Sequence, residues 1–129
     1  MSVEDARPNI AKAKSKLKDA LEMNSEVLPG PVTHSSYYAM LHAAIALLIA
    51  ERGSAPHKHA NVIAQFGMLV KDRDNDARDL GRAFNRAFDL RGVDDYDAQS
   101  DVSPEEASAA RAAAQRFVDY CAKRIGFEN

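Results

Sequence analysis

This 129-residue sequence has almost no cysteine and almost no net charge. Cys121 is the single cysteine, which excludes an internal disulfide and suits a reducing compartment. The 17 lysine and arginine residues are balanced by 19 aspartate and glutamate residues, for a net charge of −2. No overall basic field can therefore attract nucleic acid, and any such binding must depend on a local patch.

From the apolar segments we also expect neither a leader nor a membrane span. The first stretch, Met1 to Asp19, is polar and rich in lysine, unlike a signal peptide. The longest apolar run, Tyr37 to Ala50, is interrupted by His42 and is too short to cross a bilayer. We therefore expect a cytoplasmic protein that makes no membrane contact.

The motifs of common enzyme and metal sites are absent from the sequence. It holds no Gly-x-Ser-x-Gly, no phosphate-binding glycine loop and no dinucleotide fingerprint. No Glu-x-x-His pair occurs, and His57 and His59 lack thiolate or carboxylate company for zinc. The acidic run 72–76 resembles a calcium loop but has Ala77 and Ala83 where glycine and glutamate are needed. We expect no metal and no cofactor.

Helical periodicity accounts for nearly the whole chain. Sustained period-two alternation and Asn-Gly or Asp-Gly turns are absent, while alanine, leucine, arginine and lysine abound. Apolar stripes predict helices at about 4–27, 33–52, 57–70, 76–91 and 103–125. Short connections favour antiparallel neighbours. The sequence therefore predicts an all-α fold, a single domain over residues 1–129 built as an up-and-down bundle of four main helices plus one additional helix.

Specific signals mark several of these helices. Pro29-Gly30-Pro31 is expected to end the first helix, and Gly92 is expected to stop the fourth. Ser103-Pro104-Glu105-Glu106 offers an N-cap serine, a proline at the first helical position and a capping-box glutamate. From Tyr37 onward the second helix is apolar almost all round, which predicts a central helix packed on several sides.

Arg91 falls on the apolar stripe of the fourth helix, close to Phe84 on a helical wheel. A guanidinium directed at a core is costly unless it is paired, and Asp94 and Asp95 follow just downstream. A half-paired Arg91 would instead bind an anion at a cleft. The sequence leaves both interpretations open.

Two further polar patterns allow a structural and a functional interpretation. Ser35, Tyr38 and His42 form one polar stripe, which predicts either a core histidine bonded to a tyrosine or the backbone, or a wall of the Arg91 cleft. Arginines also recur every fourth residue from 78 to 86. Asp79 and Asp89 can neutralise this ridge, so it is either a solvated charged face or a track for an RNA backbone.

Three segments together resemble the HEPN domain family. They are Ser-Tyr-Tyr-Ala-Met-Leu-His-Ala-Ala at 36–44, Lys-His-Ala at 58–60, and Arg91 with Asp95-Tyr96. The resemblance covers about Ser35 to Tyr96, with a compatible helix on either side. It implies a small helical bundle, usually a homodimer with a cleft at the two-fold axis, that cleaves RNA or binds nucleotides. Members often act as toxins in toxin-antitoxin pairs or beside a minimal nucleotidyltransferase.

The ribonuclease members of that family carry an arginine, then four to six residues, then a histidine. Arg91 matches the arginine, but Tyr96, Asp97 and Ala98 occupy the histidine positions. Metal-free RNA cleavage needs a base, an acid and a cation for the phosphorane charge. Arg91 can supply the cation, whereas Asp95 as base and Tyr96 as acid would need shifted pKa values.

We therefore expect a homodimeric module that binds RNA or a nucleotide, has weak or no nuclease activity, and works with an antitoxin or a nucleotidyltransferase. The candidate catalytic residues are Arg91, Asp95 and Tyr96. The candidate cleft residues are Tyr38, His42, Lys58 and Asp94, and both copies of Arg91 are expected to face a groove on the two-fold axis. Two alternatives stay open: an active metal-independent endoribonuclease that uses the three catalytic candidates, and a purely structural protein.

Overall fold

The computed structural model describes residues 3–96 and 102–127, and the side chains of 4–91 and 102–127. Five α-helices account for most of these residues, and the described ranges contain no strand. The helices are α1 (Val3–Glu22), α2 (Pro29–Arg52), α3 (His59–Val70), α4 (Asn75–Tyr96) and α5 (Pro104–Ile125). The predicted all-α fold is therefore confirmed.

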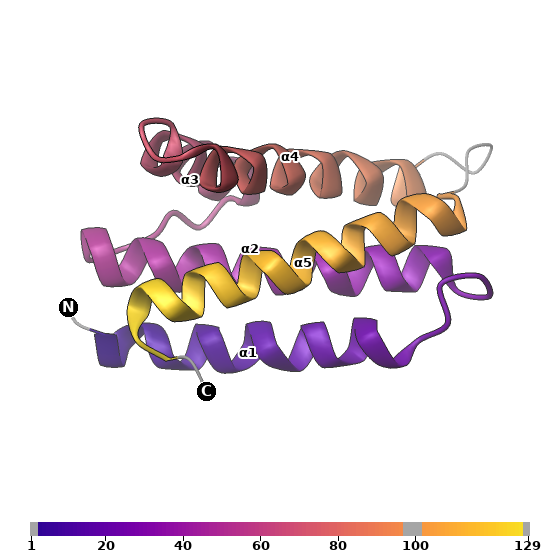
Figure 1. Cartoon of the computed structure of the whole chain (residues 1–129), viewed down its shortest axis with the longest axis horizontal. Helices are drawn as coiled ribbons and strands as arrows, with labels where there is room; N and C mark the ends of the chain where they lie inside the picture. The colour runs from indigo at the N-terminus through magenta and orange to yellow at the C-terminus, as the bar shows by residue number, and fades with distance from the viewer. Residues whose placement is uncertain (1–2, 97–101, 128–129) are drawn as a thin grey trace.

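Four long helices and one short helix form the bundle. The long helices have 20 to 24 residues and α3 has 12. Figure 1 shows α1, α2 and α5 running along the long axis, with α3 and α4 forming the upper layer. This arrangement is the predicted one of four main helices plus one.

Helix α2 lies at the centre of the bundle and contacts each of the other four helices, most extensively α1 and α5 (Figure 1). Its side chains are buried on every side, from Val32 to Leu48. Helix α2 as a whole is long and apolar enough to cross a membrane by length and composition, although 67% of its most apolar stretch is buried inside the bundle. The expected central helix is thus present. It is longer than the apolar run from Tyr37 to Ala50, which was expected to be too short to cross a bilayer.

Three phenylalanines join the remaining helices through one buried cluster. The ring of Phe66 on α3 lies 4.7 Å from that of Phe117 on α5, and Phe84 on α4 lies 5.1 Å from Phe117. All three side chains are fully buried. Aromatic pairs at these distances add to the free energy gained from burying their apolar area.

Two predicted helix boundaries are wrong. Pro29-Gly30-Pro31 begins α2 rather than ending α1, which stops at Glu22. Proline suits the first turn of a helix because the N–H that it lacks would have no partner there. Gly92 does not stop α4, which continues to Tyr96. A single glycine costs a helix only about 1 kcal/mol relative to alanine, which the continuing backbone hydrogen bonds can offset.

The predicted capping box at the start of α5 is confirmed. The Glu106 N–H donates to Ser103 Oγ, and the Ser103 N–H donates to Glu106 Oε1, both at 3.0 Å. Pro104 occupies the first turn, and Gly126 ends the helix with a φ of 98°. Glycine favours this left-handed conformation because it has no Cβ.

Two arginines tie helix ends together, each through hydrogen bonds to more than one acceptor. Arg111 on α5 donates to Met23 O at 2.9 Å and to Ala20 O at 3.4 Å, so it binds the free carbonyls at the end of α1. Arg73, in the turn before α4, donates to Tyr120 Oη at 2.9 Å and to Glu51 at 2.7 Å. Both arginines have structural roles.

Replacing Ser103 by alanine tests the contribution of the capping box. We expect Ser103→Ala to lower the free energy of unfolding by about 1 kcal/mol, because the first turn of α5 loses its side-chain acceptor. Urea denaturation measures the change. The matched control is Ser108→Ala, an exposed site in the same helix that should leave stability nearly unchanged. Equal effects of the two substitutions would contradict the role assigned to the box.

Candidate functional site around Arg91

Arg91 lies over two aromatic rings and is not part of the solvated arginine ridge of α4. Its guanidinium carbon lies 5.4 Å from the centre of the Tyr37 ring and 5.3 Å from that of Phe88. The side chain is partly buried. A cation within about 6 Å of a ring is attracted to the negative face of the ring. The rings therefore orient the guanidinium.

Tyr37 is the centre around which the site is built. Its ring is fully buried and lies 5.1 Å from Tyr38, 6.0 Å from His59 and 5.8 Å from Phe88. Burial raises the pKa of the Tyr37 hydroxyl to about 12, even though the nearby charge of Arg91 lowers it. The phenol therefore stays protonated near neutral pH and cannot act as a base.

The Tyr37 hydroxyl oxygen is buried and has no hydrogen-bond partner among the described residues. The buried hydroxyls of Thr33, about one turn earlier, and of Ser36, the preceding residue, share this condition. A buried polar group without a partner costs about 1–3 kcal/mol, so such groups are uncommon in folded proteins. Their gathering on α2 marks this part of the helix as unusual for a core.

His59 belongs to the same cluster, although the sequence analysis did not include it among the site residues. The first residue of α3, it lies 6.0 Å from the ring of Tyr37 and 5.8 Å from that of Tyr38, edge on to the latter. Burial and the charge of Arg91 lower the pKa of its imidazole, in that order. His59 is therefore neutral near neutral pH. The Lys-His-Ala segment was the sole sequence signal that pointed to it.

Tyr38 and His42 lie beside this cluster, and their role as a cleft wall stays a prediction. The Tyr38 ring is partly exposed and lies 4.8 Å from His34 and 6.4 Å from His42. His42 Nδ1 is 3.3 Å from Asn9 Oδ1 of α1, so its partner is neither of the expected ones, a tyrosine or a backbone group. Burial, followed by the charges of Lys12 and Lys16, lowers the pKa of His42.

The remaining predicted site residues are placed less fully. Lys58 is exposed and precedes α3, next to His59 in the chain. Asp94, Asp95 and Tyr96 belong to the last turn of α4, but their side chains lie outside the described part of the structure. Their assignment as partners of Arg91 or as catalytic groups stays a prediction.

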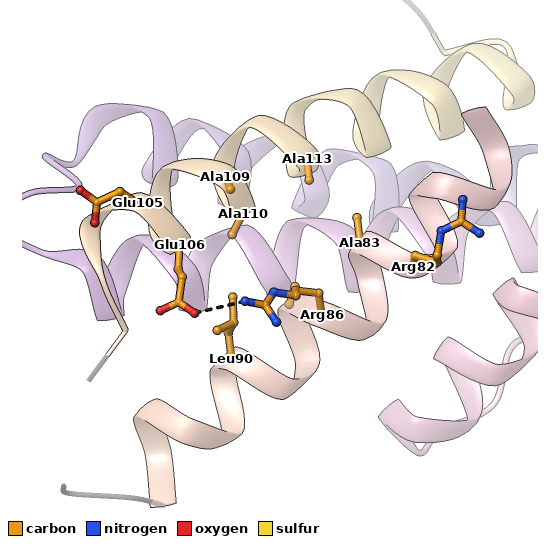
Figure 2. Close-up of a pocket in the computed structure, with 10 residues that line it drawn as sticks. Arg82, Ala83, Arg86, Leu90, Glu105, Glu106, Ala109, Ala110 and Ala113 are labelled. Carbon is orange, nitrogen blue, oxygen red and sulfur yellow. Dashed lines mark hydrogen bonds and ion pairs between the residues drawn. The ribbon is translucent and has the colours of Figure 1, made fainter. Parts of the chain in front are cut away.

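The arginine ridge of α4 borders a groove that separates α4 from α5 (Figure 2). Arg82 pairs with Asp79 on its own helix, and Arg86 reaches Glu106 of α5 at 3.2 Å rather than Asp89. The groove has a volume of about 480 Å³ and an alanine-rich floor. Because carboxylates neutralise the arginines at its rim, the ridge fits a solvated charged face better than an RNA track.

The described residues contain no group of three or more histidine, cysteine, aspartate or glutamate side chains that could hold a metal ion. Cys121 is fully buried, and burial raises the pKa of its thiol well above the usual value. It is a core residue without the thiolate character that nucleophilic chemistry needs.

The model of the HEPN domain matches residues 6–125 of this chain. The chain belongs to the HEPN domain family. The matched range includes all five helices in whole or in large part, and every described residue of the Arg91 cluster.

Two relatives support the HEPN assignment. A protein of Methanocaldococcus jannaschii named "Putative toxin MJ0605" is 29% identical over 123 residues, which are 95% of this chain and 85% of the relative. A protein of Thermotoga maritima named "UPF0332 protein" is 30% identical over 115 residues, which are 88% of this chain and 86% of the relative. The similarity thus covers most of the length of both relatives.

Replacing Tyr37 by phenylalanine tests whether its hydroxyl is satisfied in solution. We expect Tyr37→Phe to leave the free energy of unfolding unchanged or to raise it by up to about 1 kcal/mol, because a buried donor without a partner is removed while the ring beneath Arg91 remains. Urea denaturation measures the change, with Tyr38→Phe as the matched control. A loss of more than about 1 kcal/mol would mean that the hydroxyl has a partner in the folded protein.

Proposed function

We propose that this HEPN chain is a toxin-related module that binds RNA or a nucleotide, with Arg91 contacting a phosphate and with weak or no nuclease activity. Membership of the HEPN family and the toxin name of the Methanocaldococcus jannaschii relative support the general class. The orientation of Arg91 on the faces of Tyr37 and Phe88 is the observation that carries the phosphate role.

The surroundings of Arg91 suit a phosphate. Its methylenes can pack on the rings while its planar fork of donors stays directed, which is the geometry that binds phosphate oxygens in pairs. The partly exposed ring of Tyr38 lies in the same cluster and offers a face on which a base can stack. Phosphate and base contacts together describe a nucleotide or a single-stranded RNA.

Weak or absent cleavage follows from the acid–base groups at hand. The positions where ribonuclease members of the family carry the motif histidine hold Tyr96, Asp97 and Ala98. Tyr37, with its pKa raised to about 12, is also unsuited to take a proton from a 2′-hydroxyl. Arg91 can still stabilise the phosphate charge, so binding is retained more readily than catalysis.

One observation favours the competing proposal, an active metal-independent endoribonuclease that uses Arg91, Asp95 and Tyr96. Helix α4 does not stop at Gly92 but continues through Tyr96, so Asp95 and Tyr96 follow Arg91 on a continuous helix. The same continuity serves the structural alternative, in which Asp94 or Asp95 pairs with Arg91. Incubation with RNA in EDTA separates these proposals.

A homodimer with both Arg91 side chains facing a groove on the two-fold axis remains part of the proposal. An antitoxin or a nucleotidyltransferase remains the proposed protein partner, by analogy with the toxin name of the relative. A gene for either protein beside the gene for this chain would support that partner. Sedimentation at several concentrations, with Arg91→Ala as a variant, would test the dimer.

Replacing Arg91 by alanine tests the proposed phosphate contact. We expect Arg91→Ala to weaken binding of a fluorescent single-stranded RNA about tenfold or more at low salt, because one charge-assisted contact is lost. Fluorescence anisotropy in EDTA measures the affinity. The matched control, Arg82→Ala, removes an arginine of the same helix that pairs with Asp79 and should bind as wild type does.

Three outcomes separate the proposals for Arg91. Unchanged RNA affinity with a markedly lower melting temperature would contradict phosphate binding and support the structural role. RNA cleavage that Arg91→Ala abolishes would favour the endoribonuclease. Equal cleavage by wild type and Arg91→Ala would assign the activity to a contaminant.

A further inference from the structure

His59 and Arg91 approach the same aromatic side chain from two different helices. The imidazole at the start of α3 lies 6.0 Å from the centre of the Tyr37 ring, and the guanidinium of α4 lies 5.4 Å from it. Tyr38 borders His59 at 5.8 Å. His59 and Arg91 are both partly exposed, so a ligand at this edge can meet both.

Among the described residues, the ring contacts and charges that act on His59 come from aromatic and cationic groups. Helix α2 contributes Tyr37, Tyr38 and His42, and α4 contributes Arg91. Lys58 precedes His59 in the chain. Burial, followed by the charge of Arg91, lowers the pKa of His59. Protonating His59 in the empty site is therefore unfavourable, whereas an anion between the two groups would reverse that preference.

We infer that His59 is a second, proton-dependent cation of the Arg91 site, and that it makes the site selective for a terminal phosphate on a nucleoside. This inference rests on the proposed function, since it needs Arg91 to contact the phosphate. The phosphate accepts hydrogen bonds from the Arg91 fork and from a protonated His59, while the base stacks on Tyr38.

The charge of the ligand decides the selectivity. A terminal phosphate monoester carries close to two negative charges above its second pKa of about 6. An internal phosphodiester carries one. Arg91 can balance a single charge, so the second charge is what makes proton uptake by His59 favourable. A free nucleotide and the phosphorylated end of an RNA share this chemistry.

The proton linkage gives the expected sign of the pH effect. The pKa of His59 in the empty site lies below its ordinary value, and a bound dianion raises it. Binding therefore takes up a proton in the pH range above the free pKa, and affinity rises as the pH falls through that range. Measurements at pH 7 and 8 keep the phosphate itself largely dianionic.

The test compares a 5′-phosphorylated RNA hexamer, the same hexamer without the phosphate, and adenosine 5′-monophosphate. Affinities are measured in EDTA at pH 7 and pH 8 and at constant ionic strength. Calorimetry in two buffers of different ionisation enthalpy gives the proton uptake. The variants are His59→Gln and the matched control His57→Gln, which removes the exposed histidine two residues earlier.

For the wild type and His57→Gln, we expect the 5′-phosphate to raise hexamer affinity about tenfold at pH 7 and less at pH 8, with net proton uptake. We expect His59→Gln to lose this gain and the proton uptake. Adenosine 5′-monophosphate distinguishes the two possible sources of the terminal phosphate. Tight binding of this nucleotide indicates a free nucleotide. Weak binding of it, together with hexamer binding that depends on the 5′-phosphate, indicates an RNA end.

The contradicting results differ for the two proposals. A wild type without a phosphate preference, whose RNA binding still depends on Arg91, would overturn the role of His59 and leave the proposed function standing. A His59→Gln variant that keeps the preference would do the same. RNA binding that is independent of Arg91 would overturn both. If His59→Gln does not fold, an NMR titration of the wild-type His59 imidazole decides: its pKa rises on adding the 5′-phosphorylated hexamer, or the inference is wrong.

Discussion

The structure depends on the burial of one helix on all its sides. Helix α2 has thirteen buried residues spread around its circumference, so the other four helices must cover it. That requirement brings the beginning of α3 and the end of α4 to the same stretch of α2, around Tyr37. The candidate site is therefore a consequence of how the core closes rather than a separate feature added to the surface.

At that place the core accepts a cation without enclosing it. Desolvating a guanidinium is costly, and the faces of Tyr37 and Phe88 offset part of this cost through cation–π attraction. The same environment keeps Tyr37 protonated, because burial raises its pKa more than the Arg91 charge lowers it. It keeps His59 neutral, because burial and the Arg91 charge both lower the pKa of the imidazole. A rigid positive charge beside a neutral imidazole and an accessible ring suits the binding of an anionic aromatic ligand. The ridge arginines Arg82 and Arg86 instead pair with carboxylates, Asp79 and Glu106.

Features encoded by local sequence were predictable, and features set by packing were not. The five helices, the central role of α2 and the capping box at Ser103 follow from periodicity and capping chemistry within a few residues. The start of α2 at Pro29 was missed because proline both ends and begins helices, and the extension of α4 past Gly92 was missed because a lone glycine is tolerated. The packing of Arg91 toward the core was predictable from its position on an apolar stripe. The proximity of His59 to Tyr37 and the pairing of His42 with Asn9 depend on how separate helices meet. The spacing of residues along the chain does not reveal such contacts.

The central claim is that Arg91, oriented by two aromatic rings, is the group that contacts a phosphate. An ¹⁵N–¹H NMR spectrum of the arginine Nε–H groups, recorded while adenosine 5′-monophosphate is added, tests it most directly. The account predicts that the Arg91 signal, displaced in the free protein by the ring currents of Tyr37 and Phe88, moves progressively with added nucleotide, while the Arg82 and Arg86 signals stay in place. Movement of the Arg82 and Arg86 signals with a stationary Arg91 signal would contradict the account and transfer the site to the groove between α4 and α5.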